Sequence, residues 1–220
     1  MSNTISRKKD TLLDRRDQIF KVAIKSFLKK GVAQTTVREI ARAVGMSTGG
    51  LYHYFRSKNE IINTGAEWGP RSVIEIKRFR KSLGNVSPTA ALKGCIEYWL
   101  RRGDLNQDII LFQNRETLMF ELDKRHALMQ AVRDFIHFFE SLVIEGIKTG
   151  EFRTDSPTLV AFNIWAAQNE WALRRWLLRD LFTIDEYIEK QTDAILKQVG
   201  VDRSQPAENK EVTVHKVTVD

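Results

Sequence analysis

Two short helix patterns joined by a tight turn, within residues 36–58, constrain this chain more than any other stretch. Thr36 and Glu39 have the spacing of a capping box, in which each side chain bonds the other residue's backbone N–H, so a helix is expected to start directly after Thr36. Gly45 follows the apolar positions of that helix, and glycine readily adopts the left-handed backbone that ends a helix. Ser47 is a suitable N-cap for a second helix. The stretch therefore predicts two short helices that meet at a steep angle.

The second of these helices has an inward and an outward side. Leu51 and Phe55 are spaced to point into a core, which leaves small polar groups and aromatic rings facing outward. Such a short helix is typical of a helix-turn-helix unit whose second helix enters the DNA major groove. We therefore expect double-stranded DNA as a partner. The residues expected to contact it are Thr36, Arg38, Ser47, Thr48, Gly49, Tyr52, His53 and Lys58.

The same region resembles the signature of the TetR family of transcriptional repressors. The residues that carry the resemblance are the run Val44–Phe55, the run Ser57–Glu60, and upstream Ile19, Phe20, Ala23, Phe27 and Gly31. At position 48 many relatives carry Lys, whereas this chain has Thr48. The resemblance implies an all-α protein with an N-terminal three-helix DNA-binding domain and a larger helical domain for effector binding and dimerisation. It also implies a homodimeric repressor that an organic effector releases from a palindromic operator.

The distribution of charge agrees with a DNA-binding N-terminal part. Residues 1–60 contain 13 Lys and Arg against 5 Asp and Glu, which gives +8. Residues 61–220 contain 22 against 23, which gives −1, so the whole excess of the +7 chain lies in the first segment. A basic face on one small domain beside a neutral remainder is the electrostatic pattern of nucleic-acid binding.

Composition argues against several other classes of protein. The apolar runs are too short to span a bilayer, and no apolar N-terminal segment resembles a signal peptide, so we expect a cytoplasmic protein without a membrane partner. The single Cys95 excludes an internal disulfide, and its apolar setting favours a buried, inert thiol over a redox sensor. The other histidines, His126, His137 and His215, lack ligand spacing, so neither a metal nor a cofactor is predicted. Catalytic motifs are also missing, which disfavours an enzyme.

We expect four segments along the chain. They are a basic arm at 1–13, a helix-turn-helix domain at 14–60, an effector-binding and dimerisation domain at 61–200, and a tail at 201–220. The first segment reads either as a disordered tail or as an arm laid along DNA. The last one favours disorder, with an additional strand as the alternative, because a lone strand has no evident partner.

Helical periodicity predicts helices, and no strand before the tail. Around the helix-turn-helix, the expected helices run from about Asp14 to Lys30, from Ser57 towards Phe79 with a kink or break near Pro70, from Ser87 to Gly103, over about Asp108–Phe120, over about Asp123–Thr149, from Ser156 to about Asp180, and from Thr183 to Gly200.

The larger domain is expected to contain an effector site. Polar residues interrupt its apolar helices, and a largely apolar cavity with a few polar anchors is what a small-molecule site needs. It is equally open that the aromatic residues only pack the core. Arg115 is the candidate anchor for an anionic effector, with a surface ion pair as the alternative. The residues expected at this site are Trp99, Phe112, Arg115, Glu116, Trp165 and Gln168.

The last two predicted helices carry large apolar residues on more than one face. Such helices are covered on two sides, and a core on one side with a twin subunit on the other would explain the pattern. We therefore expect a homodimer. The residues expected in its interface are Trp176, Leu177, Ile188 and Ile195.

A second resemblance concerns the effector. The run Gln113–Glu116, then Gly150–Phe152 followed by Asp155 and Trp165, is similar to TetR-type regulators of fatty-acid and steroid-ring breakdown, which respond to CoA thioesters. It implies an acyl-CoA as the small-molecule partner. Two alternatives stay open, which are a constitutive DNA-binding protein without an effector and an enzyme that acts on an acyl thioester.

Overall fold

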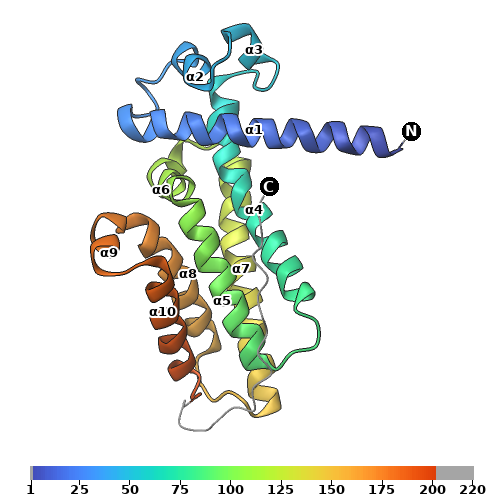
Figure 1. Cartoon of the computed structure of the whole chain (residues 1–220), viewed down its shortest axis with the longest axis vertical. Helices are drawn as coiled ribbons and strands as arrows, with labels where there is room; N and C mark the ends of the chain where they lie inside the picture. The colour runs from blue at the N-terminus through green and yellow to red at the C-terminus, as the bar shows by residue number, and fades with distance from the viewer. Residues whose placement is uncertain (1, 202–220) are drawn as a thin grey trace.

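The computed structural model describes residues 2–201 of the 220, with side chains described from residue 15 onward. Over those residues the chain forms helices and no strand, which confirms the predicted all-α class (Figure 1). The helices are α1 (Ser2–Lys30), α2 (Val37–Val44), α3 (Thr48–Tyr52), α4 (Lys58–Ser82), α5 (Pro88–Leu105), α6 (Gln107–Glu116), the 3₁₀ helix η1 (Thr117–Met119), α7 (Leu122–Thr149), α8 (Pro157–Leu173), α9 (Arg175–Leu181) and α10 (Ile184–Gln198).

A first core joins the N-terminal helices to the start of α4. Ile19, Phe20, Ala23 and Phe27 recur at helical spacing on α1, so one face of that helix is fully buried. This face packs with buried residues of α2, α3 and the first turns of α4, and with α6 from the larger domain. Figure 1 shows α1 lying across the end of the helical bundle, with α2 and α3 on its far side.

A second core fills the bundle formed by α4, α5, α7, α8 and α10. Aromatic residues dominate its centre, where the rings of Trp99 and Phe135 lie 4.0 Å apart and those of Trp171 and Tyr187 lie 4.7 Å apart. Cys95 belongs to this core and is fully buried.

Within residues 2–201, no helix is both long and apolar enough to cross a bilayer.

Helix α1 begins earlier than the sequence predicts. It starts at Ser2 instead of near Asp14, so the segment interpreted as an arm or a disordered tail has a helical backbone. Residues 2–30 contain neither Gly nor Pro, and nothing in this stretch therefore stops a helix from extending toward the N-terminus. The prediction for the C-terminal tail concerns residues 202–220, which lie outside the described part of the chain.

Helix α4 runs without interruption through Pro70, where the sequence predicts a kink or a break. Packing offsets the backbone hydrogen bond that proline removes. Trp68 and Val73 are buried on either side of it, and a Cβ on Gly69 would come within 2.6 Å of Leu128 on α7. The close approach of α4 to α7 thus supports the helix where its sequence is weakest.

Two further boundaries differ from prediction because of contacts between helices. Gly103 does not end α5 but lies inside it, where a Cβ would stand 2.3 Å from the Gln168 side chain of α8. The single helix expected up to residue 180 is divided at Arg174, whose backbone leaves the helical region. No Gly or Pro marks that break, and Arg175 directly after it pairs with Asp108 at 2.7 Å.

Candidate DNA-binding surface and effector cavity

The turn between α2 and α3 is built as the sequence predicts. The backbone N–H of Glu39 donates to Thr36 Oγ1 at 3.2 Å, and the N–H of Thr36 donates to Glu39 Oε2 at 2.9 Å, which completes the capping box. Gly45 has a φ of +74°, the left-handed conformation that ends α2. Ser47 Oγ then accepts from the N–H of Gly50 at 3.0 Å and caps α3. Local signals therefore determine the angle at which α3 leaves α2.

The two sides of α3 are separated by burial. Leu51 is fully buried and Phe55, just after the helix, is 1% exposed, so both hold the helix to its domain. Tyr52 is 49% exposed, and Gly49 and His53 are also exposed. The side expected to face DNA thus points away from the core. Its short and aromatic groups are suited to base edges and to the thymine methyl group.

Arg16 of α1 ties the end of α3 to α4. Its guanidinium lies 4.3 Å from the centre of the Phe55 ring, donates to the Tyr54 carbonyl, and bonds Glu60 Oε1 at 2.9 Å. Glu60 also accepts from the backbone N–H of Arg56 at 2.6 Å. Burial raises the pKa of Glu60, but the Arg56 N–H and Arg16 together lower it below its ordinary value. Sequence reasoning missed this anchor, because only the folded chain brings Arg16 close to residues more than thirty positions away.

The remaining DNA-facing residues differ in how free their polar groups are. Thr36 is exposed, yet its hydroxyl bonds Glu39 Oε2 at 3.1 Å and so belongs to the cap. Arg38 is exposed on α2, and Thr48 is half-buried at the start of α3. Lys58 is half-buried, with its Nζ 3.5 Å from the Ala33 carbonyl oxygen.

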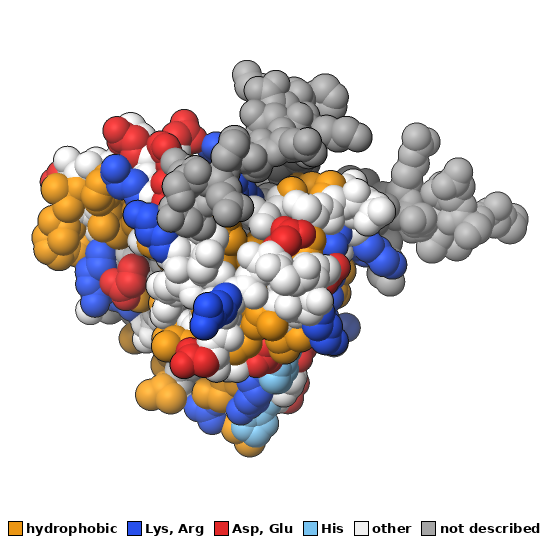
Figure 2. All heavy atoms as spheres, turned by 90° about the horizontal axis from the view of Figure 1, so that it is seen from below, with side chains coloured by type: hydrophobic (Ala, Val, Ile, Leu, Met, Phe, Trp, Pro, Cys, Tyr) orange, Lys and Arg blue, Asp and Glu red, His pale blue; other side chains and the backbone are white. Residues whose placement is uncertain are grey.

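Two exposed cations, Arg42 and Arg56, add positive charge to this surface and were not among the predicted contacts. Arg42 follows Arg38 by four positions on α2, a spacing that places both on one helix face and was available in the sequence. The far end of the molecule looks different. There, cationic, acidic and apolar side chains alternate without a surface of one sign (Figure 2).

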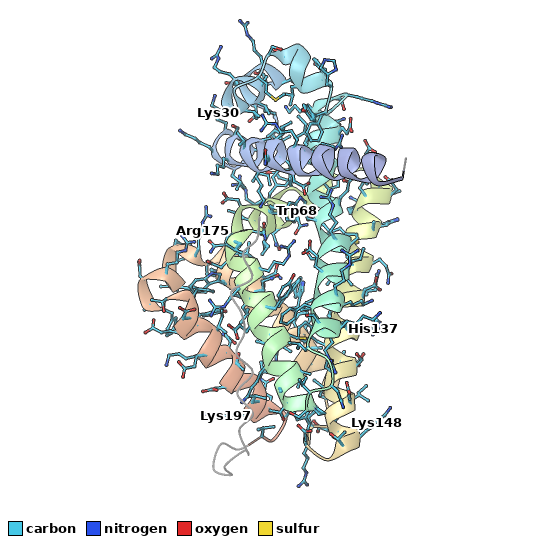
Figure 3. The ribbon with its side chains drawn as sticks, turned by 45° about the vertical axis from the view of Figure 1, so that its right-hand side comes forward. Lys30, Trp68, His137, Lys148, Arg175 and Lys197 are labelled. Carbon is cyan, nitrogen blue, oxygen red and sulfur yellow. The ribbon has the colours of Figure 1, made fainter. Side chains whose placement is uncertain are left out.

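A cavity of about 210 Å³ lies among α4, α5, α6, α7 and α8, at the level where α4 passes beneath α1. Trp68, labelled in Figure 3, lines it from α4 just below α1. Three of the residues predicted for the effector site line this cavity, namely Trp99, Trp165 and Gln168. Gln168 donates from Nε2 to the Trp99 carbonyl at 2.6 Å, which joins two of them.

The other three predicted effector residues lie outside the cavity. Phe112 is fully buried in the N-terminal core, where its ring stacks on Phe27 at 5.6 Å. Arg115 is exposed outside the lining and donates to the Leu28 carbonyl at 3.2 Å. Glu116 is also absent from the lining. The reason is helical periodicity, because the lining positions 106, 109, 110, 113, 114 and 117 form one stripe, and positions 112, 115 and 116 lie off it.

Arg102 and Trp68 are two of the lining residues that sequence reasoning missed. The guanidinium of Arg102 forms an ion pair with Glu75 of α4 and lies 5.9 Å from the Trp68 ring. Burial raises the pKa of Glu75, and Arg102 opposes that rise. Polar residues from α6 also contribute, since Gln113 donates to the Gly65 carbonyl of α4 at 2.8 Å and Asn114 donates to Asn169 at 3.2 Å.

The residues expected in the dimer interface fall into two groups. Trp176 is 70% exposed and Leu177 is 42% exposed, both on α9. Ile188 and Ile195 are 6% and 2% exposed within their own chain, so the structure contradicts their assignment to an interface. The inward face of α10 packs on α5 and α8 and needs no second subunit to cover it. Further exposed apolar residues are Leu181, also on α9, and Leu159 and Phe162 in the first half of α8.

A capped helix-turn-helix in a basic N-terminal domain, joined to a helical domain with a cavity, defines a DNA-binding transcriptional regulator. Comparison with protein families gives the particular family. Residues 19–64 match the model described as bacterial regulatory proteins, tetR family, and residues 85–180 match the tetracyclin repressor-like C-terminal domain. The two matches together span more than half of the chain, and the chain belongs to the TetR family.

Curated relatives are transcriptional regulators. The chain is 26% identical over 177 residues to the regulator HbdR of Aromatoleum sp. (strain CIB), which covers 80% of this chain and 77% of that protein. It is 24% identical over 166 residues to the repressor KstR2 of Rhodococcus jostii (strain RHA1), covering 74% of this chain and 79% of that protein.

Solved structures share the fold. PfmR from Thermus thermophilus superposes with a TM-score of 0.69 at 23% identity, covering 81% of this chain and 97% of that one. AibR, solved in complex with isovaleryl coenzyme A and operator DNA, superposes with a TM-score of 0.60 at 19% identity, covering 84% of this chain and 97% of that one. At these identities the likeness concerns the fold alone.

Proposed function

We propose that this protein is a homodimeric repressor that leaves a palindromic operator when an organic effector occupies the cavity. One observation carries the proposal. Helix α4 is a single helix of 25 residues that belongs to both functional parts. Ile61 and Ile62 are buried in the N-terminal core, and Trp68, Ser72 and Val73 line the cavity a few turns further on. A displacement of α4 by a ligand would therefore move the DNA-binding domain.

Helix α6 provides a second link between cavity and DNA-binding domain. Gln113 lines the cavity and bonds the Gly65 carbonyl of α4, while its neighbour Phe112 packs between α1 and α4. A Cβ on Gly65 would lie 2.8 Å from the Phe112 ring, so α4 and the Phe112 side chain are in close contact with no space between them. Close-packed contacts of this kind transmit small shifts, because interiors resist compression.

An acyl thioester is the effector class that the comparisons favour. AibR was solved with isovaleryl coenzyme A, and the second sequence resemblance points to regulators that respond to CoA thioesters. The cavity of about 210 Å³ is smaller than the roughly 300–1,000 Å³ typical of sites that enclose a whole ligand of drug size. We infer that it takes the acyl part of such a molecule and leaves the nucleotide outside.

Dimerisation follows from how an operator is read. One helix-turn-helix contacts few base pairs, and tight binding requires two recognition helices about 34–36 Å apart. Trp176, Leu177 and Leu181 of α9, with Leu159 and Phe162 of α8, are the exposed apolar residues that we propose for the contact between subunits.

The test of the proposal measures the operator and the effector together. A thermal-shift screen with acyl-CoAs, free acids, drugs and dyes identifies ligands, and each ligand is then titrated into protein with and without its operator. An inducer must bind more weakly to the operator-bound protein, by the same factor by which it weakens operator binding, and this factor is usually 5–150-fold, or about 1–3 kcal/mol. If no ligand changes operator affinity, the protein is a constitutive DNA-binding protein and the proposal fails.

A further inference from the structure

Three hydrogen-bond donors on the cavity lining have no acceptor among the described residues. They are the indole Nε1 of Trp68, the indole Nε1 of Trp99 and the Nε of Arg102. The two tryptophans are only 8% and 7% exposed, so bulk water does not satisfy them. Buried donors in folded proteins are nearly always bonded, and leaving one unbonded is costly. Three unbonded donors on one lining indicate a binding partner that supplies acceptor atoms.

The three donors belong to one cluster. Arg102 follows Trp99 by three positions on α5, which places both side chains on the same face of that helix. The Arg102 guanidinium lies 5.9 Å from the ring of Trp68 on α4. The same lining carries one unbonded acceptor, Asn106 Oδ1, so donors outnumber acceptors three to one. A ligand that presents an acceptor oxygen therefore suits this part of the cavity better than one that presents a donor.

The charge of the lining indicates which kind of acceptor. Arg102 is the only charged residue among the described residues that line the cavity, and its guanidinium is already paired with Glu75. A ligand carboxylate would add a second negative charge beside that ion pair, in a place where burial already raises the pKa of Glu75. A buried negative charge without its own counter-ion is strongly unfavourable, whereas a neutral oxygen only has to exchange its hydrogen bonds with water.

We propose that the effector, within the function proposed above, carries an uncharged carbonyl whose oxygen accepts hydrogen bonds from the cluster of Trp68, Trp99 and Arg102. Ketones, esters, amides and thioesters belong to this class, and free carboxylates do not. A ring or a branched alkyl chain next to the carbonyl fills the apolar part of the cavity, between Trp165, Phe135 and Leu128. Cavities of roughly 150 Å³ bind benzene in other proteins, so about 210 Å³ suits a single ring with a small substituent.

Three probes of one shape separate the possibilities. Acetophenone has the neutral carbonyl, benzoate has the carboxylate, and ethylbenzene has neither. The chain contains five tryptophans, so ¹⁵N NMR shows up to five indole N–H signals. The signals of Trp68 and Trp99 are assigned from the variants Trp68→Phe and Trp99→Phe, each of which lacks one signal. Acetophenone should move at least one of these two signals downfield, as a new hydrogen bond does, whereas ethylbenzene at saturation should not. Benzoate should bind about tenfold more weakly than acetophenone.

Removal of single donors tests the cluster directly. Arg102→Lys keeps the charge that pairs with Glu75 but lacks the Nε–H, and Trp99→Phe keeps a ring but lacks the indole donor. Each should weaken acetophenone binding several-fold, up to about tenfold, and leave ethylbenzene binding nearly unchanged. Arg133→Lys, at an exposed position of α7 outside the cavity lining, is the matched control and should change neither. Thermal melts identify any variant that has lost its fold, and two independent variants keep the test decisive.

The outcomes separate this inference from the proposed function. Three results would overturn the carbonyl assignment. They are equal affinities for benzoate and acetophenone, an equal loss of affinity for acetophenone and ethylbenzene in the variants, and no binding of any probe. Operator release by compounds without a carbonyl would leave the repressor proposal intact and contradict this inference. Acetophenone that binds with the expected shifts, while no ligand of any kind alters operator affinity, would support the inference and contradict the regulatory proposal.

Discussion

Tyr52 and Lys58 represent two kinds of DNA contact on the surface formed by α2, α3 and the start of α4. Tyr52 is 49% exposed on α3, the helix that enters the major groove in the proposed function. Lys58 is half-buried at the first turn of α4, with its Nζ near the Ala33 carbonyl. The first position is suited to reading bases and the second to holding a phosphate.

We predict that Tyr52→Ala weakens binding to the operator by about 1–3 kcal/mol and changes binding to unrelated DNA little. Lys58→Ala should weaken binding to all sequences and reduce the slope of log affinity against log salt by about one. Fluorescence anisotropy over a salt series measures both effects. Lys148→Ala, at the far end of the bundle in Figure 3, is the matched control and should change neither. Unaltered binding curves for both variants would contradict the assignment of this surface to DNA binding.

Burial suppresses the reactivity of the Cys95 thiol. Cys95 is fully buried in the second core, and burial raises the pKa of its thiol to about 12. The reactive form is the thiolate, which stays rare at any pH well below that value. Native protein at pH 8 should therefore react with a disulfide reagent far more slowly than a free thiol, and denatured protein should react at once with one thiol per chain. Rapid reaction of the native protein would show an accessible thiol.

At the scale of whole helices, local signals were sufficient where the determining residues are close in sequence. The capping box of Thr36 and Glu39 and the cap at Ser47 are present as the sequence predicts. The helices expected to start at Ser57 and Thr183 also begin with side-chain caps at those residues. Each depends on a side chain that bonds a backbone N–H within three residues. The folded environment of the rest of the chain is not needed for such a bond.

The features that could not be predicted depend on which helices meet. The apolar pattern around Phe112 predicts a residue of the effector cavity. In the structure the Phe112 ring stacks instead on Phe27 of α1, eighty-five positions away in the sequence. Ile188 and Ile195 read as a surplus apolar face, yet α5 and α8 cover that face. Periodicity shows that a face is apolar but not which partner covers it. Trp68 could not be predicted as a lining residue for the same reason, because the pattern of α4 does not show which helices surround it.

Gly103 provides a test of the contact between α5 and α8. A Cβ at this position would lie 2.3 Å from Gln168 Cγ, so Gly103→Ala must displace a buried side chain that holds the Trp99 carbonyl. We predict a loss of about 1–3 kcal/mol in unfolding free energy from overpacking, reduced by up to about 1 kcal/mol of gained helix propensity.

Chemical denaturation measures the effect of Gly103→Ala. Gly94→Ala on the same helix is the control, because its Cβ would lie 3.3 Å from the end of Leu83 and 3.9 Å from the Phe79 ring, while the gain in helix propensity is the same. The Gly94 variant should be as stable as the parent or more stable. Equal stability of the two variants would mean that Gln168 moves aside without cost.

At the scale of the whole molecule, the proposed function requires two subunits. The N-terminal domain has one recognition helix, and the excess charge of +8 on residues 1–60 attracts any DNA. Selection of one operator therefore has to come from two such helices held at groove spacing. Helices α8 and α9, which carry the exposed apolar residues of the proposed contact, lie on the other side of α1 from α3 (Figure 1). A contact between subunits through them would leave both recognition helices accessible.

We predict that Trp176→Glu, and independently Phe162→Glu, convert the protein to folded monomers that lose tight operator binding. Both side chains are exposed in the single chain, so a charge there costs little within a subunit but would be buried without a partner in a dimer. Leu118→Glu, at an 83% exposed apolar residue of η1, is the matched control and should remain dimeric. Ile188→Asp should instead unfold the chain, because that side chain is buried in its own core. Sedimentation velocity at micromolar concentration measures the mass, circular dichroism the fold, and anisotropy the operator affinity. A monomeric parent protein, or dimers in both glutamate variants, would exclude the proposed interface.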